Sequence, residues 1–354
     1  MKVFGKYFKH CMESNIFRIS GKSVRIHCWS IDGTGAYRVL ANDADKDSQE
    51  ELEFFLKKSD ADILCAFDEL EVSVNEKSHN TTFKNGNTAI RFQNPADVNE
   101  PEPVIKETAM TGFSAEEFAR AAALADKDNK DGGKVTAGVV FTKENIMLYD
   151  AGISLYYRKN GGADMNGPDD PVRVPTGMLK IITGNLKDYA IRISGKLIAM
   201  VSDFEVVYSS TYVGHKPELV GFDPIADGQI AFTEARDFMY HIRMCSAFAS
   251  LVKLTVENGV LKIENYLNNS DPRLYSTELP IETNIEKYST LFGTKALTKL
   301  FAGLQIKDEE ELVLRVNDKL MRADAEDRFL VIAATIDHDG TELKLKGETQ
   351  NEHE

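Results

Sequence analysis

Hydrophobic and polar positions follow one order three times along the chain: a helix, strands joined by a turn, a second helix, and a final group of strands. The middle copy is the clearest. Ser114 and Glu117 match a capping box ahead of an apolar helix face, and Phe113 and Phe118 are spaced for a hydrophobic staple. Strands are predicted next, over 135–159. A repeat of about 120 residues indicates copies of a domain, because solenoid units are far shorter.

The middle copy ends in a second helix and a hairpin. Residues 174–185 predict a short helix with Pro175 near its first turn. The period-two alternation over 191–210 predicts a strand, a Gly-Lys turn, and a longer strand that bends near Ser202 and Asp203. No residue of this hairpin suggests catalysis.

The last third repeats the same order. Thr233 is predicted to cap a helix that continues to about Met244. An Asn-Gly pair predicts a tight hairpin within 251–267. A second helix is predicted over 293–304 with Thr294 as its N-cap, and alternating strands follow it.

The first third fits the order less well. Residues 2–14 predict a first helix, and 23–29 and 36–41 predict strands. A capping box at 48–51 predicts a second helix, and 62–84 then predicts a hairpin. The apolar face of that second helix is predicted to contain Leu52, Phe55 and Leu56.

Acidic, proline-containing segments separate the three copies, at 94–107 and 221–228. The fold class predicted is α+β, with three repeated domains that each pack two helices on antiparallel sheets. The predicted domains are 1–105, 106–226 and 227–354, and the last carries a polar C-terminal tail.

Composition limits the classes of function. The chain has 354 residues, 42% of them hydrophobic, so it can build real cores, and its net charge is −14. An acidic chain repels phosphate on average, so any contact with nucleic acid needs basic residues gathered on one surface. The four cysteines are far apart, which predicts reduced thiols in a cytoplasmic protein. We expect no signal peptide and no membrane span.

The motifs that suggest catalysis or metal binding each lack a residue that the chemistry requires. The "SGKS" at 20–23 has Ile16 where a phosphate-binding loop needs its first glycine. The acidic stretch at 126–133 has Ala137 where a calcium loop needs glutamate, and "DHDG" at 337–340 predicts a surface turn. We therefore predict no catalytic residue, no metal and no cofactor. An enzyme of unfamiliar type stays an alternative, which a ligand retained through purification would favour.

The three copies together resemble the bacterial DNA polymerase III beta sliding clamp, the processivity factor of replication. The resemblance spans the chain, is best over 171–224, good over 230–336, and weak over 1–60. It implies that two chains close head to tail into a ring, with helices lining the hole and sheets outside. Such a ring holds duplex DNA topologically and tethers a DNA polymerase. The divergent first domain suggests a viral, plasmid or atypical bacterial origin.

The resemblance also implies that basic residues of the inner helices face double-stranded DNA, inside an acidic shell. Ordinary solvated helix faces are the alternative for each of them. The residues concerned are Lys2, Lys6, Lys9, Lys57, Lys58, Arg120, Lys127, Lys180, Arg236, Arg243, Lys295 and Lys299.

A pocket for an apolar partner peptide is implied between the middle and last domains. Its walls would be Leu155, Pro217, Phe222, Val331 and Ala333, with Thr335 at the rim. The sequence departs from the family here, because 150–154 lacks the usual basic residues and a polar tail replaces the usual Met-Pro ending. Core or loop packing is the alternative reading of these positions.

The implied junction between two chains joins Ile90 and Phe92 of the first domain to Met244 and Phe248 of the last, although core packing accounts for them equally well. The implied partners are DNA, a DNA polymerase, a clamp loader ATPase and a second copy of the chain, in the cytoplasm of a bacterium or of a phage's host. The alternative function is a similar ring that recruits transcription or repair proteins to DNA.

Overall fold

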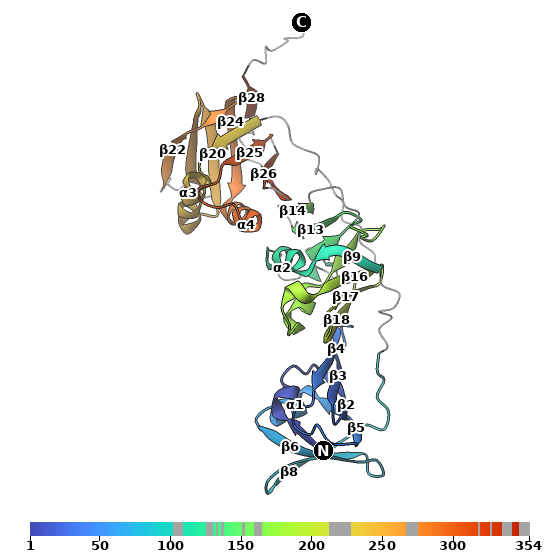
Figure 1. The fold of residues 1–354 in the computed structure, drawn as a ribbon. Helices are drawn as coiled ribbons and strands as arrows, with labels where there is room; N and C mark the ends of the chain where they lie inside the picture. The colour runs from blue at the N-terminus through green and yellow to red at the C-terminus, as the bar shows by residue number, and fades with distance from the viewer. Residues whose placement is uncertain are drawn as a thin grey trace. The chain divides into compact units, whose positions relative to one another are not determined.

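The computed structural model separates into two compact units, and Figure 1 labels the helices and strands that make them up. Unit 1 comprises Met1–Ala119 and Met165–His215, and unit 2 comprises Arg120–Asp164 and Lys216–Glu354. These units cut across the three predicted domains, whose boundaries stay a prediction. The residues that the structure describes are 1–101, 109–124, 130–131, 134–135, 138–150, 153–158, 165–211, 228–266, 275–317, 319–325, 328–334 and 342–346.

An eight-stranded antiparallel sheet forms the larger part of unit 1. Its strands, in spatial order, are β5 (Glu51–Lys57), β2 (Ser14–Ser20), β3 (Ser23–Trp29), β4 (Gly35–Ala41), β18 (Glu205–Ser210), β17 (Leu197–Val201), β16 (Ala190–Ser194) and β9 (Ala109–Ser114). The strands predicted at 23–29 and 36–41 are therefore confirmed. The pairing of β4 with β18, called the seam below, joins segments that lie far apart in the sequence.

A second, smaller sheet packs against one end of the large sheet. The two sheets enclose a hydrophobic core, from Val3 to Phe83, that is called the first core below. The order of the smaller sheet is β1 (Lys2–Phe4), β6 (Glu69–Asn75), β7 (Asn80–Asn85) and β8 (Thr88–Gln93). Between the two sheets, the Phe17 and Phe54 rings stack 5.2 Å apart, and Phe8 lies 5.8 Å from Phe83. Interlocked aromatic rings thus fill this core.

Helical segments in unit 1 are short. Over the described residues of unit 1 they are η1 (Gly5–Phe8), α1 (Lys58–Leu64), η3 (Thr176–Ile181), η4 (Leu186–Asp188) and the start of α2 (Ala115–Leu124). The helix predicted over 2–14 is wrong, since this stretch forms β1 and a single 3₁₀ turn. Gly5 explains the difference: a Cβ there would lie 1.9 Å from the carbonyl oxygen of Phe67, and its N–H donates to Asp68. The backbone at Gly5 therefore lies directly against the backbone of Phe67 and Asp68, and it does not continue as an α-helix.

The helix predicted from the capping box at 48–51 is also wrong. Residues 51–57 form β5, which pairs with β2 along its whole length. Phe54 and Leu56 are buried, whereas Glu53 and Lys57 are exposed and Phe55 is half-buried, so the true period is two. The Ser48 hydroxyl accepts from the Glu50 N–H in a turn and caps no helix.

The middle copy agrees better with the sequence. The Glu116 N–H donates to Ser114 Oγ at 3.1 Å and the Ser114 N–H donates to Glu117 Oε2 at 3.1 Å, which confirms the capping box of α2. The helix predicted over 174–185 is the 3₁₀ helix η3, preceded by β15 (Val172–Val174). The bend near Ser202 is a complete turn that separates β17 from β18.

Two antiparallel sheets form unit 2. The strands of the first sheet that belong to unit 2 run in the order β12 (Gly138–Phe141), β13 (Asn145–Asp150), β14 (Ile153–Arg158), β27 (Arg328–Ala333), β26 (Leu320–Asp324), β25 (Leu312–Val316), β19 (Gly228–Phe232) and β23 (Glu282–Thr283). The second is β22 (Ser276–Pro280), β21 (Val260–Tyr266), β20 (Leu251–Glu257), β24 (Ile285–Gly293) and β28 (Glu342–Leu345). A separate short pair consists of β10 (Lys130–Asp131) and β11 (Lys134–Val135).

Two full helices cover these sheets, α3 (Ala235–Phe248) and α4 (Thr294–Leu304). Both predicted helices are confirmed. Their predicted N-caps, Thr233 and Thr294, are wrong by one residue, since Glu234 and Gly293 occupy the N-cap positions. Thr294 lies inside α4, where its hydroxyl donates to the Ala249 carbonyl. The predicted Asn-Gly hairpin is confirmed between β20 and β21.

Candidate nucleic-acid interface

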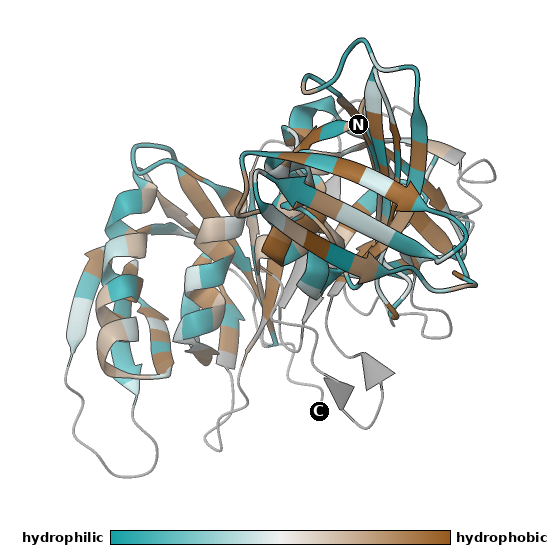
Figure 2. Cartoon of the chain, turned by 90° about the horizontal axis from the view of Figure 1, so that it is seen from below, coloured by the Kyte–Doolittle hydropathy of each residue, from teal (hydrophilic) through white to brown (hydrophobic). Residues whose placement is uncertain are grey.

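Helices α3 and α4 lie side by side on the sheets of unit 2, and hydrophilic and hydrophobic residues alternate around both of them (Figure 2). Their inward positions are apolar: Phe238, Ile242, Leu297 and Leu300 have no exposed surface. Since residues three and four apart share a helix face, the remaining positions form an outward face.

The outward face carries most of the predicted basic residues of unit 2. Arg236, Tyr240 and Arg243 follow one another at spacings of four and three along α3, and all three are exposed. On α4, Lys295 is exposed and Lys299, four residues later, is half-buried. The helical spacing that the sequence indicated for these residues is therefore present.

The two arginines of α3 differ in whether they form an ion pair. Arg236 pairs with Glu234, directly before the helix. Arg243 forms no ion pair with any residue that the structure describes. Its guanidinium group is thus available to an external anion such as a phosphate.

Tyr240 was missed by the sequence reasoning. It is 55% exposed between Arg236 and Arg243, and its ring stands edge-on to His241 at 5.1 Å. The spacing of four and three from two basic residues was the signal that could have found it. An exposed aromatic ring between two guanidinium groups suits a contact with a sugar or a base.

Four predicted lysines gather in unit 1, because η1 contacts α1. Lys6 lies on η1 with its ammonium 4.9 Å from the centre of the Phe4 ring, and Lys9 follows that turn. Lys57 directly precedes α1 and Lys58 begins it. All four are exposed, and Lys58 pairs with Asp62 at 3.5 Å.

The remaining predicted basic residues have separate positions. Lys2 is not on a helix, since it lies in β1 and pairs with Glu69 at 2.8 Å. Arg120 is half-buried on α2 and Lys180 is exposed on η3. Lys127 lies outside the described residues.

The structure brings together part of the predicted partner-peptide pocket. Leu155 and Val331 lie on the paired strands β14 and β27, where Ser154 is the partner of Val331 and Leu155 that of Leu330. Val331 is 5% exposed, so it also serves the core. Ala333 ends β27. Pro217, Phe222 and Thr335 lie outside the described residues.

The residues predicted at the junction between chains divide into two kinds. Ile90 and Phe92 lie on β8, the edge strand of its sheet, and both pack against the first core of unit 1. Met244 is half-buried on α3, and Phe248 at the end of that helix is 49% exposed. Phe248 is thus the accessible apolar side chain of the four.

A buried polar network that sequence reasoning missed crosses the seam in unit 1. Arg38 Nε donates to Glu205 Oε1 at 2.5 Å, and these side chains are 3% and 4% exposed. The other oxygen of Glu205 accepts from the Thr183 N–H at 2.9 Å and from the Tyr189 hydroxyl. Burial, with Glu205 beside it, raises the pKa of Tyr189 to about 12. Satisfying the remaining lone pairs in this way is what makes a buried pair tolerable.

A second polar cluster at the seam holds Glu100, which lies in the segment that follows β8. Glu100 accepts from Arg18 at 2.7 Å and contacts His27 Nδ1 at 2.6 Å, while His27 Nε2 lies 2.8 Å from the Tyr208 hydroxyl. Burial lowers the pKa of His27 against the opposing effect of Glu100. The hydrogen bond from Arg18 lowers the pKa of Glu100. A neutral imidazole and an ionised carboxylate follow at neutral pH.

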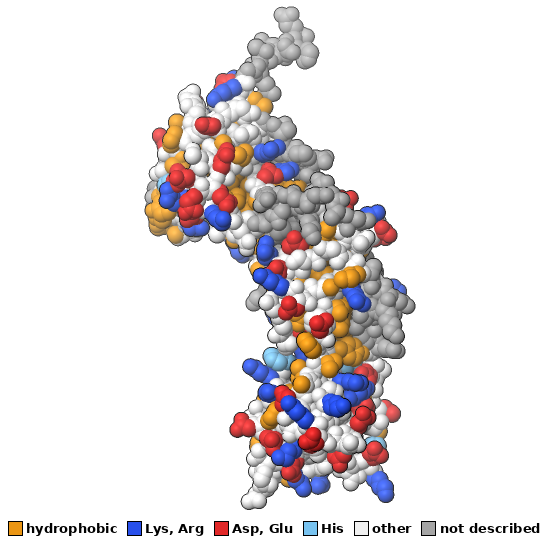
Figure 3. All heavy atoms as spheres, in the orientation of Figure 1, with side chains coloured by type: hydrophobic (Ala, Val, Ile, Leu, Met, Phe, Trp, Pro, Cys, Tyr) orange, Lys and Arg blue, Asp and Glu red, His pale blue; other side chains and the backbone are white. Residues whose placement is uncertain are grey.

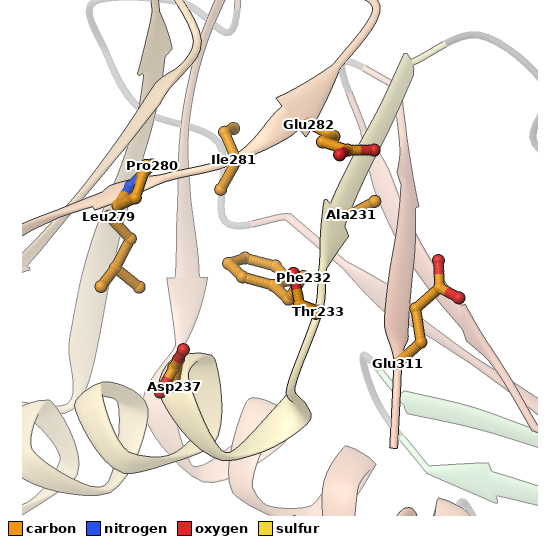
Figure 4. A pocket seen from close by; sticks show the side chains of 9 residues that line it. All are labelled: Ala231, Phe232, Thr233, Asp237, Leu279, Pro280, Ile281, Glu282 and Glu311. Carbon is orange, nitrogen blue, oxygen red and sulfur yellow. The ribbon is translucent and has the colours of Figure 1, made fainter. Parts of the chain in front are cut away.

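A pocket of about 540 Å³ opens in unit 2 beside the first turn of α3 (Figure 4). Phe232, Leu279 and Ile281 supply apolar walls, and Asp237, Glu282 and Glu311 supply carboxylates. None of the residues predicted for the partner peptide lines this pocket. Its carboxylates suit a cationic group and disfavour a phosphate.

On the face drawn in Figure 3, acidic and basic side chains are intermixed. The described residues contain no cluster of three or more His, Cys, Asp or Glu side chains arranged to hold a metal. Among their helices, none is long and apolar enough to span a membrane.

Comparison with known proteins gives a match in structure and none in sequence. No family model and no curated protein matches the chain. The structure is similar to DNA polymerase III subunit beta of Pseudomonas aeruginosa, with a TM-score of 0.76 and 12% identity over 95% of this chain and 99% of that one. The chain has the fold of the bacterial beta clamps.

Other beta clamps give the same result. The Helicobacter pylori beta clamp, in a structure bound to a DNA ligase peptide, has a TM-score of 0.75 and 12% identity, over 95% of this chain and 99% of that one. The beta subunit of Streptococcus pyogenes has a TM-score of 0.71 and 11% identity, over 94% and 99%. The expected α+β clamp fold is therefore confirmed, although the sequence shares little with these proteins.

Proposed function

We propose that the chain is a DNA sliding clamp, which closes as a ring of two copies around duplex DNA and tethers the replicative DNA polymerase. The beta-clamp fold over 95% of the chain is the observation that carries this proposal. Three domains, at 1–105, 106–226 and 227–354, are proposed for each copy. No chemical step is assigned to the ring, and we propose that a separate ATPase loads it.

The charge distribution supports a sliding contact with DNA. The chain has a net charge of −14, yet the outward faces of α3 and α4 carry Arg236, Arg243, Lys295 and Lys299. An acidic molecule with basic helix faces repels DNA over most of its surface and attracts it at those faces. A few phosphate contacts suffice, because many strong contacts would stop sliding.

Two exposed sheet edges support a head-to-tail junction between two copies. β8 ends the small sheet of unit 1, and β22 ends one sheet of unit 2. Arg91 is exposed on β8, and Glu278 and Glu282 are exposed on β22 and β23; none of the three forms an ion pair with a described residue. Pairing these edges would cover unpaired backbone groups and bring opposite charges together.

Solution mass tests the junction. Light scattering after size exclusion should give twice the 39.5 kDa of one chain. Arg91→Glu should weaken the dimer about tenfold, and adding Glu278→Arg should restore it, since a reciprocal swap rebuilds the charge pair. A monomer at every concentration, or an Arg91→Glu defect that Glu278→Arg leaves unchanged, would contradict this junction.

Partner recruitment is proposed at the β14–β27 pair. The DNA ligase peptide bound to the H. pylori clamp supports recruitment of DNA-processing enzymes in general. Leu155 and Val331 lie on these neighbouring strands, opposite Leu330 and Ser154, and are proposed to form its apolar wall. Pull-down from the source cell discriminates between the two functions: a DNA polymerase catalytic subunit supports the processivity role, and an RNA polymerase or repair enzyme supports the alternative.

A further inference from the structure

A second pocket, of about 450 Å³, opens on unit 1 beside η1. The N-terminal segment contributes Phe4, Lys6 and Lys9, and the segment after α1 contributes Cys65, Phe67 and Asp68. Lys6 and Lys9 are among the lysines proposed to face DNA, but a cavity beside them is not needed for sliding on a duplex.

The backbone holds the two sides of this pocket together. The Gly5 N–H donates to the Asp68 carbonyl at 3.2 Å, and Phe4 pairs with Glu69 in the β1–β6 register. A Cβ at Gly5 would lie 1.9 Å from the Phe67 carbonyl oxygen, so only glycine permits this approach. The positions of Phe4 and Phe67 are therefore fixed by backbone contacts on either side of Gly5.

The pocket joins aromatic surface to positive charge. Phe4 and Phe67 are both half-buried, which leaves part of each ring exposed to an occupant. The Lys6 ammonium lies 4.9 Å from the centre of the Phe4 ring, and Lys9 forms no ion pair with a described residue. Sites for single-stranded nucleic acid combine these two elements, because bases stack on aromatic rings and cations attract the backbone.

We propose that this pocket binds one unpaired nucleotide, with its base against Phe4 and Phe67 and its phosphate beside Lys6 and Lys9. A duplex keeps its bases inside the stack, so only a single-stranded stretch or a free nucleotide supplies this ligand. The inference rests on the proposed function in one respect, that the nucleotide comes from a single-stranded stretch of the encircled DNA.

Asp68 gives the site a preference among bases. Its side chain is exposed at the pocket and forms no ion pair within the described chain. A carboxylate accepts hydrogen bonds from exocyclic amines, which adenine, cytosine and guanine carry and thymine lacks. Oligo(dA) should therefore bind better than oligo(dT).

Binding can be measured by the chemical labelling of Cys65, which lines the pocket and is half-buried. The other cysteines, Cys11, Cys28 and Cys245, are buried. The rate of maleimide labelling at Cys65 would be followed by peptide mass spectrometry with oligo(dA), oligo(dT), a blunt duplex or dAMP. Oligo(dA) should slow labelling at least about fivefold, as stacking of one base implies, with less protection by oligo(dT) and none by duplex.

Two variants and a matched control complete the test. Lys9→Ala and Phe67→Leu should each remove most of the protection, whereas Lys22→Ala, at an exposed lysine on the β2–β3 turn, should leave it unchanged. Equal protection by oligo(dT) and oligo(dA), protection by duplex, or protection that persists in both pocket variants would overturn the proposal. Protection by dAMP alone would overturn the link to DNA.

The labelling test requires neither ring closure nor loading. Protection of Cys65 by oligo(dA) together with failure to form a dimer would therefore reject the clamp function and keep the nucleotide site. The reverse combination would reject the site and keep the clamp.

Discussion

The first and last thirds of the chain cover their sheets with different elements. In the last third, α3 of 14 residues and α4 of 11 residues cover the sheets. In the first third, η1 of four residues and α1 of seven stand in the same place in the order of elements. Aromatic rings compensate there: Phe17 stacks on Phe54 between two strands, and Phe8 of η1 meets Phe83 of β7 edge-on. The fold thus requires a covered sheet and tolerates a short helix.

The difference also bears on the proposed surface. Full helices present Arg236, Tyr240 and Arg243 along one face. The short segments of the first third present Lys6 and Lys9 around a pocket. We expect the last third to supply the smoother contact with a duplex.

Removing one ring from each core gives the largest expected effect. Phe8 and Phe238 both have no exposed surface. Phe8→Ala and Phe238→Ala should each lower the free energy of unfolding of their own unit by about 3–5 kcal/mol, because each leaves a cavity. Urea unfolding measures both. A loss under about 1 kcal/mol for Phe8→Ala would show that η1 is no structural substitute for a helix.

Ion pairs offer the next contrast. Arg38→Ala should cost about 3–5 kcal/mol, since it leaves Glu205 buried without its partner at the seam. Arg236→Ala in the last third removes an exposed pair and should cost no more than about 1 kcal/mol. Equal losses in thermal or urea unfolding would contradict the distinction between the two regions.

Acid should weaken the first region through His27. Its pKa in the folded chain lies below the ordinary 6.5, so the unfolded chain binds the proton first. This contribution to stability is complete above pH 6.5 and is lost as the pH falls through 6.5 toward the folded pKa. His27→Gln should flatten the dependence of Tm on pH over this range. Glu100, Arg18 and Tyr208 face the imidazole, and the lowered pKa of Glu100 places its own loss in more acidic solution.

Capping residues test the sequence reasoning itself. Ser114→Ala should cost about 1 kcal/mol, because its hydroxyl accepts from the first turn of α2. Thr233→Ala, at the cap that the sequence predicted for α3, should cost under about 0.5 kcal/mol, since Glu234 holds the N-cap position. The comparison fails if Thr233→Ala is the more damaging variant in urea.

Binding to duplex DNA should show the smallest differences. Arg243→Ala should reduce the slope of log affinity against log salt by about 0.9, the release expected for one phosphate contact. Lys58→Ala should change it less, because Lys58 already pairs with Asp62. Equal slopes for Arg243→Ala and the parent chain would remove α3 from the proposed surface.

Local patterns predicted much of this fold. Strands at 23–29 and 36–41, the α2 capping box and the Asn-Gly hairpin follow from a few neighbouring residues, and the structure contains them. The failure at 51–57 has a physical cause. Leu52, Phe55 and Leu56 suit a helix face, while Leu52, Phe54 and Leu56 suit a strand, and pairing with β2 decides between them.

The site was predictable where spacing along one helix defines it. Arg236 and Arg243, and likewise Lys295 and Lys299, needed only the helical period. The seam was not predictable, since Arg38 meets Glu205 across 167 residues and His27 meets Tyr208 across 181. The pocket beside η1 depended on the approach of Gly5 to Phe67, which no periodicity encodes.

Retention on circular DNA tests the central claim most directly. The dimer would be assembled from diluted chains in the presence of nicked circular plasmid, then separated by gel filtration before and after a single restriction cut. A sliding clamp should elute with the circle in high salt and leave it once the DNA is linear, because the link is topological. A dimer that is never retained, or that stays bound equally after the cut, would contradict the account.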